Sequence, residues 1–143
     1  MSQQGSEITL EEFLDEWPPE QAGLKTSLLT YREGVLALPG VRESFLARPG
    51  ISYSLRWDLD PRPAGRRRPL FNMLDVVPLG GTEMMLSVCF YQDEINDPEE
   101  LGNAIPQGLY GETGYCFDIE TADARMVAYC LERAAEAHAA GRA

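Results

Sequence analysis

The chain has 143 residues, of which 44% are hydrophobic and 24% charged, and its formal net charge is −11. This length and composition are sufficient for one packed core, so we expect a disordered N-terminus over residues 1–7 and a single α+β domain over residues 8–143. The negative charge argues against general nucleic-acid binding, because such binding depends on Lys and Arg side chains that neutralise phosphates.

Two helices are predicted before the first strand. Thr9 and Glu12 have the spacing of a capping box, so the first helix begins at Leu10, and Pro18-Pro19 ends it. A second helix is predicted from about residue 24 to 38, where apolar residues recur at helical spacing.

Alternating apolar and polar residues predict strands over residues 51–58, 70–77, 83–91 and 115–120. Their short connections favour an antiparallel arrangement. Residues 92–114 are interpreted as a long acidic loop with one or two helical turns beginning at Asp97. A final helix follows Thr121. The expected fold is α+β, an antiparallel sheet of about four strands with N-terminal helices and a long C-terminal helix packed on one face.

The sheet face opposite the helices, here called the open face, is predicted to be mixed in character. Phe71, Met73 and Tyr91 would lie there beside charged residues. Such a face is solvated, packs against a second copy of the chain, or forms the floor of a small-molecule cleft under the loop 92–114. For the cleft, the candidate binding residues are Arg56, Asp75, Tyr91 and Tyr110.

Residues 61–69, here called the arginine loop, read PRPAGRRRP and concentrate basic residues between two predicted strands. The candidate interaction residues are Arg62, Arg66, Arg67 and Arg68. They would bind nucleic acid weakly, or an acidic surface supplied by the chain's own loop or by a partner.

Few residues suggest catalysis. His138, the single histidine, is expected to be exposed near the end of the last helix. Cys89 and Cys116 would share the open face if their strands pair; a redox pair is one interpretation, and inert thiols are favoured because no basic residue adjoins either. Motifs for dinucleotides, nucleoside triphosphates, zinc proteases and common hydrolases do not occur. No catalytic residue, metal or cofactor is predicted.

Three short stretches carry a resemblance to known proteins. They are Leu38 to Val41, Ile51-Ser52-Tyr53 and the Asp97-Pro98-Glu99-Glu100-Leu101 loop, arranged in this order among helices and strands. Over residues 24 to 136 the chain resembles the small bacterial α+β domains of the YdhG-like and MmcQ/YjbR-like groups. The resemblance implies the α+β fold and transfers no catalytic residue. Those groups carry a basic strand after the Asp-Pro loop, whereas residues 115 to 120 here are acidic.

The sequence is compatible with three functions. The first is a cytoplasmic binding or accessory domain without catalysis, self-associating through the open face or docking to an acidic protein partner. The alternative is a small-ligand-binding protein or enzyme with a cleft under residues 92–114, and the third is weak nucleic-acid binding through Arg66 to Arg68. No membrane partner is expected, because no apolar run has the length of a span and no signal peptide is recognised.

Overall fold

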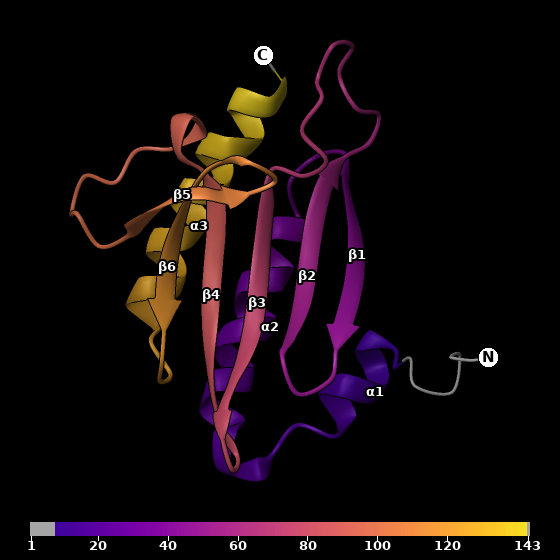
Figure 1. The fold of residues 1–143 in the computed structure, drawn as a ribbon, viewed down its shortest axis with the longest axis vertical. Helices are drawn as coiled ribbons and strands as arrows, with labels where there is room; N and C mark the ends of the chain where they lie inside the picture. Colours follow the sequence, from indigo (N-terminus) through magenta and orange to yellow (C-terminus); the bar gives the residue numbers. More distant parts are fainter. Residues whose placement is uncertain (1–7, 143) are drawn as a thin grey trace.

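The computed structural model describes residues 8–142, so the expectation for residues 1–7 lies outside the described residues. These residues form an α+β fold in which helices cover one face of an antiparallel sheet (Figure 1). In chain order the elements are α1 (Leu10–Asp15), η2 (Pro19–Gln21), α2 (Ala22–Leu36), β1 (Val41–Arg48), β2 (Ser52–Leu59), β3 (Asn72–Gly80), β4 (Glu83–Tyr91), η3 (Gln92–Glu94), β5 (Asn103–Leu109), β6 (Glu112–Ile119) and α3 (Ala124–Arg142).

The sheet has six strands, in the order β1-β2-β3-β4-β6-β5, so the expectation of about four strands was wrong. The strands predicted from alternation are β2, β3, β4 and β6, and each of the two additional strands lies at an edge. In β1, Glu43 occupies an inward position where an apolar residue is expected. It is accommodated because Arg32 donates two hydrogen bonds to its carboxylate, at 2.9 and 2.8 Å, and Trp57 Nε1 donates a third at 3.0 Å.

The main core lies between the sheet and the helices α2 and α3. Its centre is formed by fully buried side chains of β2, β3, β4 and β6 packed against both helices. Gly34 allows the helices to approach closely, since a Cβ there would lie 2.6 Å from Leu131 Cδ2. One polar contact is buried here: Asn72 donates to the Tyr31 hydroxyl at 2.7 Å. This core fixes β2 and β3, the strands that carry the candidate binding residues Arg56 and Asp75.

His138 is buried, which corrects the expectation of an exposed residue at a helix end. Helix α3 continues to Arg142, so His138 lies inside it rather than at its end. Its Nε2 is 2.7 Å from the carbonyl oxygen of Pro39, and its ring packs edge-on against Phe71. Phe71 therefore belongs to the helix side of the sheet, not to the open face as predicted.

Residues 92–114, expected to form a long loop, contain the 3-10 turn η3, the strand β5 and the start of β6. The expected helical turn at Asp97 is absent, and a short 3-10 turn, η3, precedes it instead. Asp97 accepts hydrogen bonds from the backbone N–H groups of Leu101 and Gly102 and from the hydroxyls of Tyr115 and Tyr129. Burial raises the pKa of Asp97, but these four hydrogen bonds outweigh it and lower the pKa to about 2. The segment thus starts from a fixed point and continues into the β5–β6 hairpin.

Within residues 8–142, no helix combines the length and the apolar character needed to cross a membrane.

Candidate functional site

The tip of the β5–β6 hairpin covers part of the open face. In Figure 1, β5 crosses in front of β4 rather than continuing the plane of the sheet. Leu109, at the end of β5, is buried in a second, smaller apolar cluster on this side of the sheet. The cluster, here called the hairpin-side cluster, consists of Leu70, Met73, Cys89, Tyr91 and Leu109, with Cys116 packed against it.

Tyr110 and Gly111 form a two-residue turn between β5 and β6. Their φ angles are 51° and 81°, and Leu109 pairs with Glu112 across the turn. Hairpin turns with positive φ at both positions favour Asn-Gly or Asp-Gly, because other side chains are strained in the left-handed region. Tyr110 nevertheless occupies the first position, and its hydroxyl accepts a hydrogen bond from Arg56 Nη1 at 2.9 Å. The strained residue of the hairpin tip is thus connected to β2, 54 residues earlier in the chain.

A pocket of about 330 Å³ lies beside this contact, between the hairpin tip and the open face. A second hollow of about 290 Å³ lies on the other side of Arg56 and Tyr110, which line both. The larger one is here called the hairpin pocket, and its lining residues are Arg48, Ser52, Arg56, Met73, Asp75, Gly108, Leu109 and Tyr110.

The charged groups of the hairpin pocket are not paired with each other. In the described part of the chain, Arg48 and Arg56 have no carboxylate within 4.0 Å, and Asp75 has no basic nitrogen within that distance. Burial raises the pKa of Asp75, although the Ser54 hydroxyl and the charges of Arg56 and Arg48 act in the opposite direction. The pocket therefore holds two cations and one half-buried carboxylate that are free to meet a ligand.

Three of the four predicted binding residues are brought together here, and the fourth is not. Arg56, Asp75 and Tyr110 line the hairpin pocket, whereas Tyr91 is only 1% exposed and lies in the hairpin-side cluster. The Arg68 guanidinium stacks over the Tyr91 ring at 4.2 Å from its centroid. Burial raises the pKa of Tyr91 to about 12, so its hydroxyl stays protonated at neutral pH. Tyr91 thus packs in the same apolar cluster as Leu109 of the hairpin and does not line the hairpin pocket.

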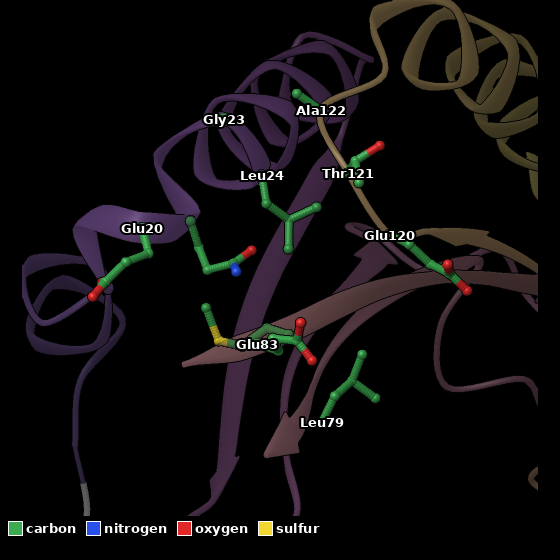
Figure 2. A pocket seen from close by; sticks show the side chains of 10 residues that line it. Glu20, Gly23, Leu24, Leu79, Glu83, Glu120, Thr121 and Ala122 are labelled. Atoms are coloured by element: carbon green, nitrogen blue, oxygen red, sulfur yellow. The ribbon is translucent and has the colours of Figure 1, made fainter. Parts of the chain in front are cut away.

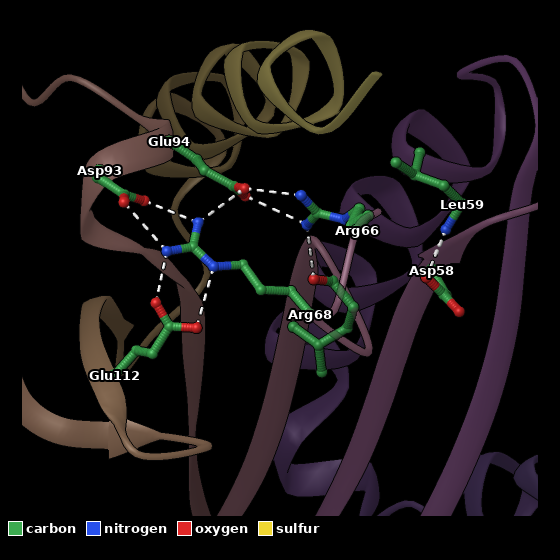
Figure 3. Close-up of polar contacts among 8 residues, drawn as sticks. Asp58, Leu59, Arg66, Arg68, Asp93, Glu94 and Glu112 are labelled. Carbon is green, nitrogen blue, oxygen red and sulfur yellow. Dashed lines mark hydrogen bonds and ion pairs between the residues drawn. The ribbon is translucent and has the colours of Figure 1, made fainter. Parts of the chain in front are cut away.

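The arginine loop contacts the chain's own acidic residues (Figure 3). Arg68 lies between Asp93 and Glu112 and pairs with both, and it also reaches Glu94 at 2.9 Å. Arg66 pairs with Glu94 at 2.8 Å, and these two side chains are only 9% and 7% exposed. We call Arg66, Arg68, Asp93, Glu94 and Glu112 the arginine–acid cluster.

The remaining arginines of the loop differ in their surroundings. Arg62 pairs with Asp58 at 2.6 Å, at the end of β2. Arg67 makes no ion pair with any of residues 8–142.

The arginine–acid cluster also changes the pKa values of its carboxylates. Hydrogen bonds from Arg68 are the main cause that lowers the pKa of Asp93 and of Glu112. Most of the loop's positive charge is thus neutralised within the molecule.

Cys89 and Cys116 are joined as a disulfide between β4 and β6. They are directly opposite in the register, with their Cα atoms 4.2 Å apart, so the predicted sharing of the open face is confirmed. The preference for two inert thiols is corrected by this bond. Basic neighbours were the wrong criterion, because cross-strand pairing alone brings the two sulfur atoms together. Cys130 is a free, buried thiol in the main core.

Another hollow, of about 470 Å³, lies between the start of α2, the β3–β4 turn and the segment before α3 (Figure 2). Glu20, Glu83 and Glu120 line it together with the apolar side chains of Leu24 and Leu79. Among residues 8–142, no three His, Cys, Asp or Glu side chains are close enough to hold a metal ion. None of the predicted site residues lies here.

No family model, curated protein or solved structure matches the chain. The candidate site therefore depends on geometry alone. Sequence reasoning missed the turn conformation of Tyr110. Gly111 was the only local signal for this turn, because a tyrosine is not a residue that favours it.

Proposed function

We propose that the chain is a non-catalytic binding domain that holds a small ligand in the hairpin pocket, with Arg56 as its principal contact. The observation that carries this proposal is the bridge from Arg56 to the strained turn residue Tyr110. Strained backbone persists where the surrounding structure requires it, and it is concentrated at functional sites. Here the strain places a phenol beside a guanidinium at the rim of a pocket.

The Arg56 side chain is oriented before any ligand arrives. Its Nε donates to the Ser54 hydroxyl at 3.2 Å, and its Nη1 donates to Tyr110. A guanidinium has five N–H donors, so others remain for a ligand. Fixing the side chain in advance lowers the entropy lost on binding, which favours affinity for a small molecule.

Self-association through the open face receives less support from the geometry. It was inferred from apolar residues that would be exposed there, and the chain itself covers the most important of them. Met73 is 8% exposed and Tyr91 1% exposed, because both pack in the hairpin-side cluster with Leu109 and Arg68 lies over the Tyr91 ring. An exposed apolar patch is the usual sign of a protein interface. The covered residues do not provide one.

Nucleic-acid binding through the arginine loop is disfavoured for a related reason. Phosphate binding requires basic side chains whose charge is available. Arg66 and Arg68 are occupied by Asp93, Glu94 and Glu112, and the protein carries a net charge of −11. Binding of this kind would have to break several charge-assisted hydrogen bonds.

A thermal-unfolding screen against small metabolites tests the proposal. A ligand present at 100 times its Kd stabilises the native state by about 2.7 kcal/mol. We expect at least one metabolite to raise the melting temperature of the wild-type chain and to lose this effect in Arg56→Gln. The matched control is Arg67→Gln. Arg67 lies outside the pocket and makes no ion pair with residues 8–142. A screen with no stabilising compound, or equal stabilisation of Arg56→Gln, would contradict the proposal.

A further inference from the structure

We propose that the ligand of the hairpin pocket is a zwitterionic α-amino acid, with its carboxylate bound by Arg56 and Arg48 and its ammonium group bound by Asp75. This inference rests on the proposed function and adds the chemical class of the ligand. It follows from the signs, the spacing and the surroundings of the charged groups that line one pocket.

The signs of these charges define the first requirement. Arg48, Arg56 and Asp75 line the same pocket, and none of them has an oppositely charged partner within 4.0 Å among residues 8–142. Elsewhere the chain pairs its arginines repeatedly, as Arg32, Arg66, Arg68 and Arg133 show. A ligand that satisfies both signs must carry an anionic and a cationic group.

The sheet register sets the separation of those two groups. In the register of β2 and β3, Arg56 lies opposite Met73 and Ser54 lies opposite Asp75. Arg56 and Asp75 are therefore diagonal neighbours on one face of these two strands. Diagonal neighbours are about 7–8 Å apart at their backbones, which is within reach of a long side chain. A short Asp and a long Arg from such positions meet groups that are close together in the ligand. The carboxylate and ammonium of an α-amino acid are separated by a single carbon.

Desolvation of Asp75 strengthens the requirement for a cation. Its side chain is half-buried, and burial raises its pKa more than the Ser54 hydroxyl and the charges of Arg56 and Arg48 lower it, so the carboxylate is only partly compensated for its withdrawal from water. An ammonium group beside it would restore that compensation with a charge-assisted hydrogen bond. A phosphate or a dicarboxylate would instead place a second negative charge near Asp75. Purely anionic ligands are therefore disfavoured even though two arginines are present.

The floor of the pocket suits the remainder of an amino acid. Met73 and Leu109 provide apolar surface, and both belong to the hairpin-side cluster. Gly108 adds no side chain, and a Cβ there would lie 2.3 Å from Ile105 Cγ2. The volume of about 330 Å³ is near the lower end of ligand pockets. An amino acid fits this volume better than a nucleotide does, and the small apolar surface of Met73 and Leu109 would contact its side chain.

Isothermal titration with chemically blocked probes tests the class. The probes are the free amino acids leucine, methionine and phenylalanine, N-acetyl-leucine, which lacks the ammonium, leucinamide, which lacks the carboxylate, and inorganic phosphate. We expect at least one free amino acid to bind the wild-type chain at least tenfold more tightly than each of the other three probes.

Variants assign the two charges. Asp75→Asn should weaken the amino acid at least tenfold and leave N-acetyl-leucine unchanged, so the preference between these two probes disappears. Arg56→Gln should weaken both. The matched control is Asp118→Asn, which removes an exposed carboxylate from the same open face outside the pocket and should leave every affinity unchanged. Asp75→Ser is a second variant, and circular dichroism verifies that each variant folds.

The failure of this inference differs from failure of the proposed function. If N-acetyl-leucine or phosphate binds at the Arg56-dependent site and free amino acids do not, the amino-acid class is wrong and the binding domain stands. If free amino acids bind but Asp75→Asn has no effect, the assignment of the ammonium is wrong. If neither these probes nor any metabolite of the thermal screen binds, both proposals are wrong.

Discussion

Tyr110 is the residue at which backbone conformation and site chemistry conflict. It has a φ of 51° in a turn that favours Asn, and its hydroxyl accepts from Arg56. We predict that Tyr110→Asn has a free energy of unfolding about 1 kcal/mol higher than Tyr110→Phe, because both lack the Arg56 contact and only Asn tolerates the left-handed conformation. The same variant should lose ligand stabilisation. Urea unfolding with and without ligand measures both effects.

Tyr110→Phe is the matched control for this prediction. Phenylalanine keeps the strained conformation and removes only the hydroxyl, so the variant should lose the Arg56 contact without any gain in stability. If Tyr110→Asn is less stable than Tyr110→Phe, the left-handed conformation of residue 110 does not reduce the stability of the protein, and the prediction is wrong.

The sequence allowed some residues of the site to be predicted and not others, for physical reasons. Arg56 and Asp75 lie in strands whose alternation indicates which face each side chain occupies. Tyr91 has the same alternation, but its burial depends on Arg68, which is 23 residues away in the chain and reaches it only after folding. Local periodicity contains no information about such a contact. The contact between Arg56 and Tyr110 joins residues that are even farther apart in the chain, by 54 positions.

At the scale of elements, the disulfide joins the two strands that support the hairpin tip. Cys89 in β4 and Cys116 in β6 are separated by 27 residues, and a cross-link of this span stabilises a fold by roughly 3 kcal/mol, mainly by restricting the unfolded chain. We predict that dithiothreitol lowers the free energy of unfolding by about this amount. Chemical unfolding followed by tryptophan fluorescence, with and without the reductant, measures the change.

The double variant Cys89→Ser/Cys116→Ser serves as the comparison. It should match the reduced wild-type chain in stability and be indifferent to dithiothreitol. The remaining cysteine, Cys130, is a free, buried thiol, so it has no disulfide for the reductant to cleave. A double variant that still loses stability on reduction would contradict the assignment of the effect to this bond.

The two strands that the sequence did not reveal are both edge strands, and each breaks a different rule. β1 places the charged Glu43 among its inward residues, and the charge is acceptable only because Arg32 and Trp57 donate to it. β5 contains Pro106 and Gly108, and nearly all of its residues are exposed. Proline is confined to edge strands and bulges, since it cannot donate to the ladder. The exposed residues of β5 are therefore not under the packing constraint that produces a period of two.

At the scale of the whole molecule, the arginine–acid cluster connects three segments that are distant in the chain. Arg66 and Arg68 come from the arginine loop, Asp93 and Glu94 from η3, and Glu112 from the start of β6 (Figure 3). The cluster lies beside the hairpin-side cluster, because Arg68 also covers Tyr91. It therefore ties the arginine loop to the hairpin tip, whose residues Gly108, Leu109 and Tyr110 line the hairpin pocket.

The acidic groups of the arginine–acid cluster, together with Asp97, should make the stability of the protein depend on pH. Hydrogen bonds lower the pKa values of Asp93, Glu112 and Asp97 in the folded chain, that of Asp97 to about 2. A lowered folded pKa means that the stabilisation is complete above the unfolded values of about 4 and is lost as pH falls below them. After solvent screening is allowed for, Asp97 contributes about 1 kcal/mol. Urea unfolding between pH 7 and pH 3 should show this decline, and Asp97→Asn should reduce its steepness. If the free energy of unfolding of Asp97→Asn declines with falling pH as steeply as that of the wild-type chain, Asp97 does not contribute to the pH dependence.

Glu94→Gln isolates the buried part of the arginine–acid cluster. Removing one partner of a buried ion pair leaves an uncompensated charge and costs about 3–5 kcal/mol, and Arg66 and Glu94 are both more than nine-tenths buried. The control is Glu99→Gln, which breaks the exposed pair with Arg125 and should cost less than about 1 kcal/mol. Because Arg66 also donates to the Leu70 carbonyl at 3.0 Å, hydrogen exchange in Glu94→Gln should increase first in the arginine loop and the hairpin tip. Faster exchange confined to α2 and α3 would show that the cluster stabilises the helices, and not the segments around the pocket.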